Sequence, residues 1–169
     1  MLKVALAHDP FRISDLPASF ARQSDKYGPH QKKQSAQAWS LMYQLLLKDA
    51  DTKKDFELVV DENGKPFLKD DPRYISLSHC QDACAVMISD RPCAIDLESL
   101  TRVIHDPLKN RIGVQGNDRA LAFLMEEEAL LKLTGKKMLA KRTPDGMKDV
   151  WLGTMTWNGH LVVLAGSRT

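Results

Sequence analysis

Cys93-Ala94-Ile95-Asp96-Leu97-Glu98 is a short apolar run that ends in two carboxylates. It follows the turn signal Ser89-Asp90-Arg91-Pro92, which predicts a strand over residues 93–98. Residues two apart in a strand point to the same face, so Asp96 and Glu98 project together. Two neighbouring anions repel each other unless a cation lies between them, and carboxylate oxygens suit Mg²⁺. The alternative is that both are solvated at a strand edge, because this pattern is short and common.

Strands and helices are mixed along the rest of the chain. A helix is predicted over about 31–48 and a second over about 118–134, the latter ending at Gly135. Residues 103–118 are expected to be irregular because they contain Pro107, Gly113 and Gly116. This mixed order, without strict alternation, predicts the α+β class. Further extended segments are expected at 2–7, 56–60 and 75–79, an apolar segment at 83–88, and a hairpin of strands 150–156 and 160–165 that turns at Asn158-Gly159.

The bulk composition limits the possible partners. The chain has 169 residues, enough for one domain or for two small halves that share a core. Its 24 basic and 22 acidic side chains are too evenly balanced to imply a nucleic-acid or membrane partner. No apolar stretch approaches the ~20 residues that cross a bilayer. The apolar start is too brief for a signal peptide, so a cytoplasmic protein is expected.

The cysteines do not predict a metal site. Cys80, Cys84 and Cys93 are odd in number and contain no C-x-x-C pair, so buried or half-buried reduced thiols are expected. Cys80 and Cys84 could reach one metal ion only with ligands that the sequence does not obviously supply. A zinc site is therefore not expected.

Two further segments carry groups suited to chemistry. Glu128 and Lys132 lie four residues apart in the second helix and therefore share a face. An exposed ion pair worth ~0.3–0.5 kcal/mol is the simpler interpretation. Ser78 and His79 follow an extended segment, where they could bind phosphate or where His79 could shuttle a proton. A hydrogen-bonded loop histidine is the simpler interpretation there.

In their order, these segments resemble the 4′-phosphopantetheinyl transferase superfamily. Ser76 to Cys80 is similar to its S-H segment, Ala94 to Glu98 to its D-x-E strand, and Leu124 to Lys132 to its K-E-x-x-x-K helix. Gly64-Lys65-Pro66-Phe67 is similar to its G-K-P segment, and Gly159 to Ala165 to its last strand. The match spans about residues 62–165, and four ordered motifs are more specific than any one of them.

The resemblance implies a fold and a reaction. The fold is that of the larger, pseudo-dimeric members: two similar α+β halves, 1–90 and 91–169, related by a pseudo-twofold, with the active site at their seam in a compact monomer. The reaction is Mg²⁺-dependent transfer of 4′-phosphopantetheine from coenzyme A to a serine of an apo acyl or peptidyl carrier protein, releasing adenosine 3′,5′-bisphosphate. No nucleic acid or membrane takes part.

The resemblance also implies roles for single residues. Asp96, Glu98 and Glu128 hold Mg²⁺, with Asp96 taken as an exposed ligand, and Glu128 deprotonates the carrier serine directly or through a water. Lys132 holds the pyrophosphate. The catalytic residues are thus Glu128, Lys132 and Asp96, and the coenzyme A contacts are Lys65 and Pro66 on the adenine side, Ser78, His79 and Lys132 on the phosphates, and one or more of Lys26, Lys32 and Lys33 on the 3′-phosphate.

Several positions depart from the family pattern. Leu124 replaces an aromatic residue, Ala94 replaces a glycine, and Glu127 replaces a lysine beside a polyanionic substrate. The F-x-x-x-E stretch is not recognisable in residues 103–118. Two alternatives therefore stay open: a coenzyme A- or carrier-binding homologue with impaired turnover, and a metal-dependent phosphohydrolase that uses the same carboxylates.

Overall fold

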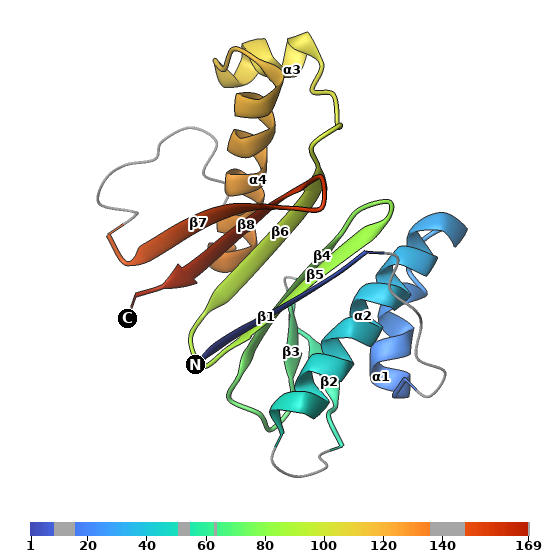
Figure 1. Cartoon of the computed structure of the whole chain (residues 1–169). Helices are drawn as coiled ribbons and strands as arrows, with labels where there is room; N and C mark the ends of the chain where they lie inside the picture. Colours follow the sequence, from blue (N-terminus) through green and yellow to red (C-terminus); the bar gives the residue numbers. More distant parts are fainter. Residues whose placement is uncertain (9–15, 51–54, 63, 136–147, 169) are drawn as a thin grey trace.

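The computed structural model describes residues 1–8, 16–50, 55–62, 64–135 and 148–168, and these form an α+β protein (Figure 1). The described strands form two three-stranded antiparallel sheets and one two-stranded sheet. The predicted α+β class is confirmed. In chain order the elements are β1 (Leu2–His8), α1 (Ala18–Ala21), the 3₁₀ turn η1 (Arg22–Ser24), α2 (Pro29–Asp49), β2 (Leu58–Val60), β3 (Pro66–Leu68), β4 (Tyr74–His79), β5 (Ala83–Ser89), β6 (Cys93–Ser99), α3 (Asp106–Ile112), α4 (Asn117–Thr134), β7 (Val150–Trp157) and β8 (His160–Ser167).

The two larger sheets share one strand order. The first sheet runs β1-β5-β4 and the second runs β6-β8-β7. In each, a first strand is followed by a long helix and then by a hairpin whose last strand lies in the centre. The helix α2 packs against the first sheet and α4 against the second.

The sheets meet where β4 lies beside β6. The backbone N–H of Ile95 in β6 donates to the hydroxyl of Ser76 in β4 at 3.0 Å. The thiol of Cys93 reaches the carbonyl of Tyr74 at 3.8 Å. This seam places the end of β4 next to the carboxylates of β6.

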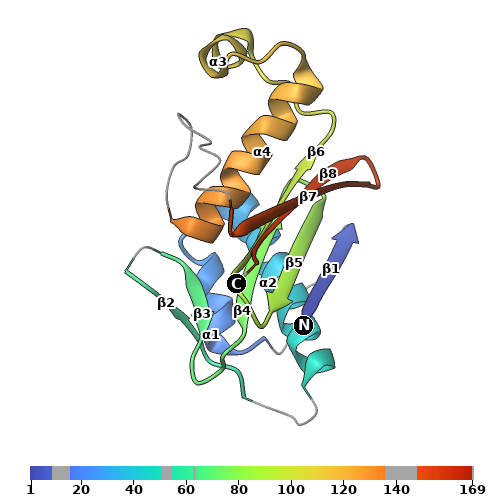
Figure 2. The same ribbon diagram turned by 90° about the vertical axis from the view of Figure 1, so that its left-hand side faces the viewer.

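Three apolar clusters hold these layers. Under α2, Trp39 and Met42 pack against Val86 of β5. Under α4, Leu121 and Met125 pack against strands of the second sheet. The third cluster lies between the two sheets and includes Met87, Ile95, Leu97 and Val162. Figure 2 shows α3 at the N-terminal end of α4, at the opposite end of the molecule from β2 and β3.

Several predicted boundaries are confirmed. The hairpin turns at Asn158 and Gly159, whose φ angles of 44° and 75° are both positive, as a tight two-residue hairpin turn requires. The helix α4 ends before Gly135, which is left-handed at φ 71°. Among the described residues, none of the helices combines the length and the apolarity that crossing a bilayer requires.

The irregular segment expected over residues 103–118 is wrong in part, because α3 lies inside it. Pro107 occupies the second position of this helix, where its missing N–H costs nothing. Gly113, with φ 69°, ends the helix in the left-handed conformation. The proline and glycine that suggested irregular chain therefore mark the two ends of a short helix.

Candidate functional site

A cavity of about 510 Å³ opens at the seam between β4, β6 and α4. Its wall is completed by Tyr27, from the turn before α2, and by residues that follow β6. Of the predicted site residues, the cavity brings together Ser78, His79, Asp96, Glu98, Glu128 and Lys132.

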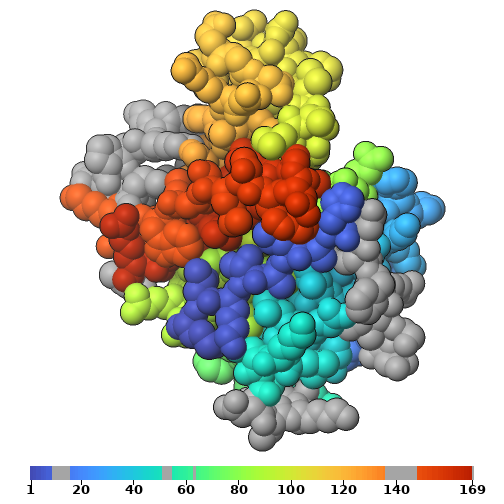
Figure 3. All heavy atoms as spheres, in the orientation of Figure 1, coloured from blue at the N-terminus to red at the C-terminus, as the bar shows by residue number. Residues whose placement is uncertain are grey.

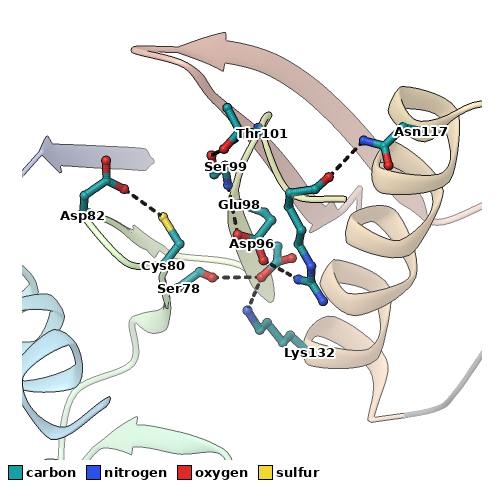
Figure 4. A network of polar contacts seen from close by, with 10 residues as sticks. Ser78, Cys80, Asp82, Asp96, Glu98, Ser99, Thr101, Asn117 and Lys132 are labelled. Carbon is teal, nitrogen blue, oxygen red and sulfur yellow. Dashed lines mark hydrogen bonds and ion pairs between the residues drawn. The ribbon is translucent and has the colours of Figure 1, made fainter. Parts of the chain in front are cut away.

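Asp96 is the centre of the polar contacts in this cavity. Its Oδ1 accepts a hydrogen bond from the Ser78 hydroxyl at 2.8 Å and from the Lys132 ammonium at 2.7 Å (Figure 4). Lys132 also donates to the backbone carbonyl of Ile95 at 3.2 Å. The three segments singled out in the sequence are thus joined directly. Asp96 is only 9% exposed, so the expectation of an exposed ligand is wrong: β4 and α4 cover it from both sides.

Glu98 is held by partners within its own segment. Its carboxylate forms an ion pair with Arg102 and accepts a hydrogen bond from the Ser99 backbone N–H at 3.0 Å. Arg102 also lines the cavity, although no motif in the sequence marked it. Arg102 follows Glu98 by four residues, but outside a helix this spacing does not predict that the two side chains meet.

The helix α4 turns one face to the cavity. Leu121, Leu124, Glu128 and Lys132 line it, at the three- and four-residue spacing of one helical face. Glu128 is exposed on this face. Among the described residues, the ion-pair partner of Lys132 is Asp96 rather than Glu128. Glu127 is 6% exposed and does not line the cavity, so the charge that departs from the family pattern faces elsewhere.

His79 lies at the cavity edge without a polar partner among the described residues for its buried Nδ1. Burial, and then the charge of Lys132, lower the pKa of His79 below its ordinary value of 6.5. The ring packs edge-on against Tyr27, with centroids 6.3 Å apart. Tyr27 was not predicted, and Lys26 lies 5.4 Å from the Tyr27 ring centroid.

The structure does not bring Lys65 and Pro66 to this cavity. They lie at the start of β3, where the Lys65 backbone N–H donates to the Asp61 carboxylate at 2.8 Å. Lys32, one of the candidates for a 3′-phosphate, forms an ion pair with Asp25 at 2.8 Å. The cavity thus contains the residues that were expected to contact phosphate and metal, and it lacks the two residues that were expected to contact adenine.

The cavity carboxylates do not form one tight ligand set. Asp96 and Glu98 are each paired with a cation, Lys132 and Arg102. Within the described part of the chain, a different group, Cys80, Asp82 and His160, places three ligand atoms within 4.8 Å of one another. The chemistry of the cavity donors still fits Mg²⁺, because Asp96, Glu98 and Glu128 all offer carboxylate oxygens, and the Arg102 partner of Glu98 is exposed.

The thiols are buried as the sequence predicts. Cys84 and Cys93 are buried and Cys80 is half-buried. Burial raises the pKa of Cys84 and of Cys93 to about 12, so both are protonated and inert.

No protein-family model matches the chain, and no curated protein matches it. The fold and the cavity define the class of the protein. It is an α+β protein with a charged cavity at the seam of two sheets of equal strand order.

Proposed function

We propose that the protein transfers the 4′-phosphopantetheine group of coenzyme A to a serine of an acyl or peptidyl carrier protein, with Mg²⁺. The observation that carries the proposal is the convergence of three distant segments on one cavity. Ser78 of β4 and Lys132 of α4 both bond to Asp96 of β6, and Glu128 lines the same wall. These are the segments on which the resemblance to the transferase superfamily depends.

The strand orders β1-β5-β4 and β6-β8-β7 support the fold of that superfamily. Two units, each made of a strand, a helix and a hairpin with its last strand in the centre, suit a pseudo-twofold relation between halves 1–90 and 91–169. The boundary falls in the turn between β5 and β6, and the cavity takes residues from both sides of it. A monomer with one such cavity is the assembly that we propose.

The reaction forms one phosphate ester bond and breaks one phosphoanhydride bond. The carrier serine oxygen attacks the β-phosphorus of coenzyme A, and Glu128 takes its proton directly or through a water. The bond from the β-phosphorus to the bridging oxygen breaks, and adenosine 3′,5′-bisphosphate leaves with the electron pair. Lys132 turns from Asp96 to the pyrophosphate and stabilises its growing charge, while Ser78 and His79 orient the phosphate oxygens.

Asp96, Glu98 and Glu128 would hold Mg²⁺ in this proposal. The ion would supply positive charge against the pyrophosphate. The exposed Glu98–Arg102 pair is weak enough to exchange for a divalent ion. The contact between Lys132 and Asp96 places the lysine ammonium next to the carboxylates that would hold the ion.

The test is incubation of the protein with coenzyme A, Mg²⁺ and a panel of apo carrier proteins, read by intact mass. We expect one carrier to gain one phosphopantetheine, and Glu128→Gln to abolish the gain. Glu126→Gln is the matched control, because Glu126 lies on the same helix and does not line the cavity. A Glu128→Gln variant with unchanged Mg²⁺-dependent transfer would contradict the assignment of the site.

A coenzyme A- or carrier-binding homologue without turnover is the second candidate. The cation-paired state of Asp96 and Glu98 favours it, because the carboxylates are not preassembled for a metal ion. Binding of coenzyme A with no mass gain on any carrier would support this second function. Phosphate release without any acceptor would instead indicate the phosphohydrolase.

A further inference from the structure

A second group of potential ligands lies at the tips of three strands. Cys80 and Asp82 flank the turn between β4 and β5, and His160 begins β8 after the hairpin turn. Their ligand atoms all lie within 4.8 Å of one another. His8, at the end of β1, approaches the same carboxylate, with its Nε2 3.0 Å from Oδ2 of Asp82. Figure 3 shows the end of β1 (blue) against the tip of the β7–β8 hairpin (red).

The contacts of His160 indicate a cation. This side chain is 3% exposed, and both of its ring nitrogens face oxygen acceptors: Nδ1 is 2.8 Å from the Asn158 carbonyl and Nε2 is 2.9 Å from Oδ1 of Asp82. A neutral imidazole has one N–H and can donate to only one of them. Either the ring carries two protons, or its Nδ1–H donates to Asn158 while Nε2 and Asp82 share a metal ion.

The other two side chains favour the metal ion. An imidazolium–carboxylate pair needs neither a thiol nor a second imidazole, yet Cys80 Sγ lies 3.7 Å from Oδ1 of Asp82 and His8 lies on its other oxygen. One thiol, one imidazole and one carboxylate supply three of the four ligands of a tetrahedral zinc-type ion, and His8 holds the outer oxygen of the carboxylate. The carbonyl of Asn158 occupies the outer position that holds a ligating histidine in the correct tautomer.

We propose that Cys80, Asp82 and His160 bind one divalent transition-metal ion of the zinc type, with His8 holding the second carboxylate oxygen of Asp82. The site goes beyond the proposed transfer reaction and does not depend on it. Cys80 and Asp82 come from the β4–β5 turn of the first sheet, and His160 comes from the second sheet. A bound ion would therefore link the two sheets near Ser78 and His79 at the end of β4.

Ligand chemistry separates this site from the cavity. Thiolate and imidazole select zinc-type ions over Mg²⁺, whereas Asp96, Glu98 and Glu128 offer only carboxylate oxygens. Excess Mg²⁺ is therefore not expected to displace the zinc-type ion. A negative result in the transfer assay would not bear on this metal site, and a negative result in the metal titration would not bear on the proposed function.

The test uses the full, reduced chain after removal of metals with a chelator, titrated with Co²⁺ as a coloured probe for Zn²⁺. We expect one equivalent to bind, with a thiolate-to-cobalt charge-transfer band and tetrahedral visible bands that Zn²⁺ abolishes and Mg²⁺ does not. Cys80→Ser should lose the charge-transfer band. Cys84→Ser, a change at the neighbouring buried thiol outside the group, should keep it.

A histidine variant tests the outer partner of Asp82 without changing the buried His160. His8→Gln should weaken Zn²⁺ binding by at least about tenfold, and His30→Gln, at an exposed position in α2, should not change it. Zn²⁺ should raise the Tm of the wild type and leave that of Cys80→Ser unchanged. Absence of the thiolate band in the wild type, its survival in Cys80→Ser, or its equal loss in Cys84→Ser would overturn the proposal.

Discussion

Two ion-pair networks among the described residues, one in the first half of the sequence and one in the second, differ in how completely they are shielded from solvent. In the first half, Arg73 spreads its guanidinium over two carboxylates, with 2.7 Å contacts to Asp49 and to Asp71. The side chains of both acids are less than 5% exposed, and Lys3 also pairs with Asp49. In the second half, Lys132 meets Asp96 at 2.7 Å, but its side chain is 28% exposed and lines the cavity.

The difference separates a structural network from one that can exchange partners. Arginine has a planar fork with fixed donor positions, and that of Arg73 is engaged through all three of its nitrogens. The hydrogen bonds to Asp71 and Asp49 raise the pKa of Arg73. The hydrogen bond from Lys3, together with that from Arg73, lowers the pKa of Asp49. Lysine is a flexible point charge, so Lys132 can move from Asp96 to an incoming phosphate. The second network is therefore the one suited to function.

Among the variants that compare the two networks, Asp96→Asn has the largest expected effect, and this effect is on activity. Asp96→Asn keeps the shape and the Ser78 hydrogen bond but removes the charge that Lys132 and a metal ion need. We expect phosphopantetheine transfer to fall by about 10²–10³-fold, the loss typical of removing one preorganised electrostatic group. Intact mass of the carrier over time measures it, with Asp90→Asn on an exposed turn as the control. Full activity in Asp96→Asn would remove the contrast between the networks.

The next effect is on stability at Arg73. Arg73→Met leaves Asp49 and Asp71 shielded with one fewer cation, so we expect a loss of about 3 kcal/mol in the free energy of unfolding, the lower end for a broken buried pair. Urea denaturation measures it, and Arg119→Met, at an exposed position on α4, should change little. The transfer rate per folded molecule should stay the same. A loss of rate without loss of stability would reverse the roles of the two networks.

Much of the fold was predictable because it depends on local signals. The Asn158-Gly159 hairpin turn and the helix end at Gly135 need positive φ angles. Few residues other than glycine and asparagine adopt them, so these residues predict the turn and the helix end. The helix α3 was missed because Pro107 and Gly113 are typical both of irregular chain and of helix ends. The relation of the two sheets depends on side-chain packing between distant strands, and no local pattern specifies it.

The site was predictable only where a motif marked it. Asp96, Glu128 and Lys132 reach one cavity as their motifs suggest. Arg102 and Tyr27 were missed because each lies in a connecting segment, where spacing carries no structural meaning. The approach of Cys80 to His160 joins residues 80 positions apart through the β4–β5 turn and the β7–β8 hairpin, so it required the three-dimensional arrangement.

A smaller effect on substrate use is expected at Lys132. Lys132→Met removes the charge but keeps most of the apolar stem that packs along the cavity wall. A charge-assisted hydrogen bond is worth about 1.5–3 kcal/mol, so kcat/KM for coenzyme A should fall by about 10- to 100-fold. Steady-state assays over a range of coenzyme A concentrations measure it. Lys48→Met in the last turn of α2 is the matched control, and an equal effect there would point to bulk charge alone.

The smallest effect is a pH dependence that sharpens the same contrast at His79. In the folded protein the pKa of His79 lies below its ordinary value of 6.5, because of burial and then of Lys132. Between these two pKa values the unfolded chain binds more protons, so stability falls as the pH drops through 6.5 toward the folded value. His79→Gln removes this term, and its unfolding free energy should fall less than that of the wild type when the pH is lowered across 6.5. His30→Gln, at an exposed position, should behave like the wild type.

Since Lys132 lies beside His79, Lys132→Met should reduce the slope of the unfolding free energy against pH relative to the wild type. An unchanged slope would show that the Lys132–Asp96 network does not affect this histidine.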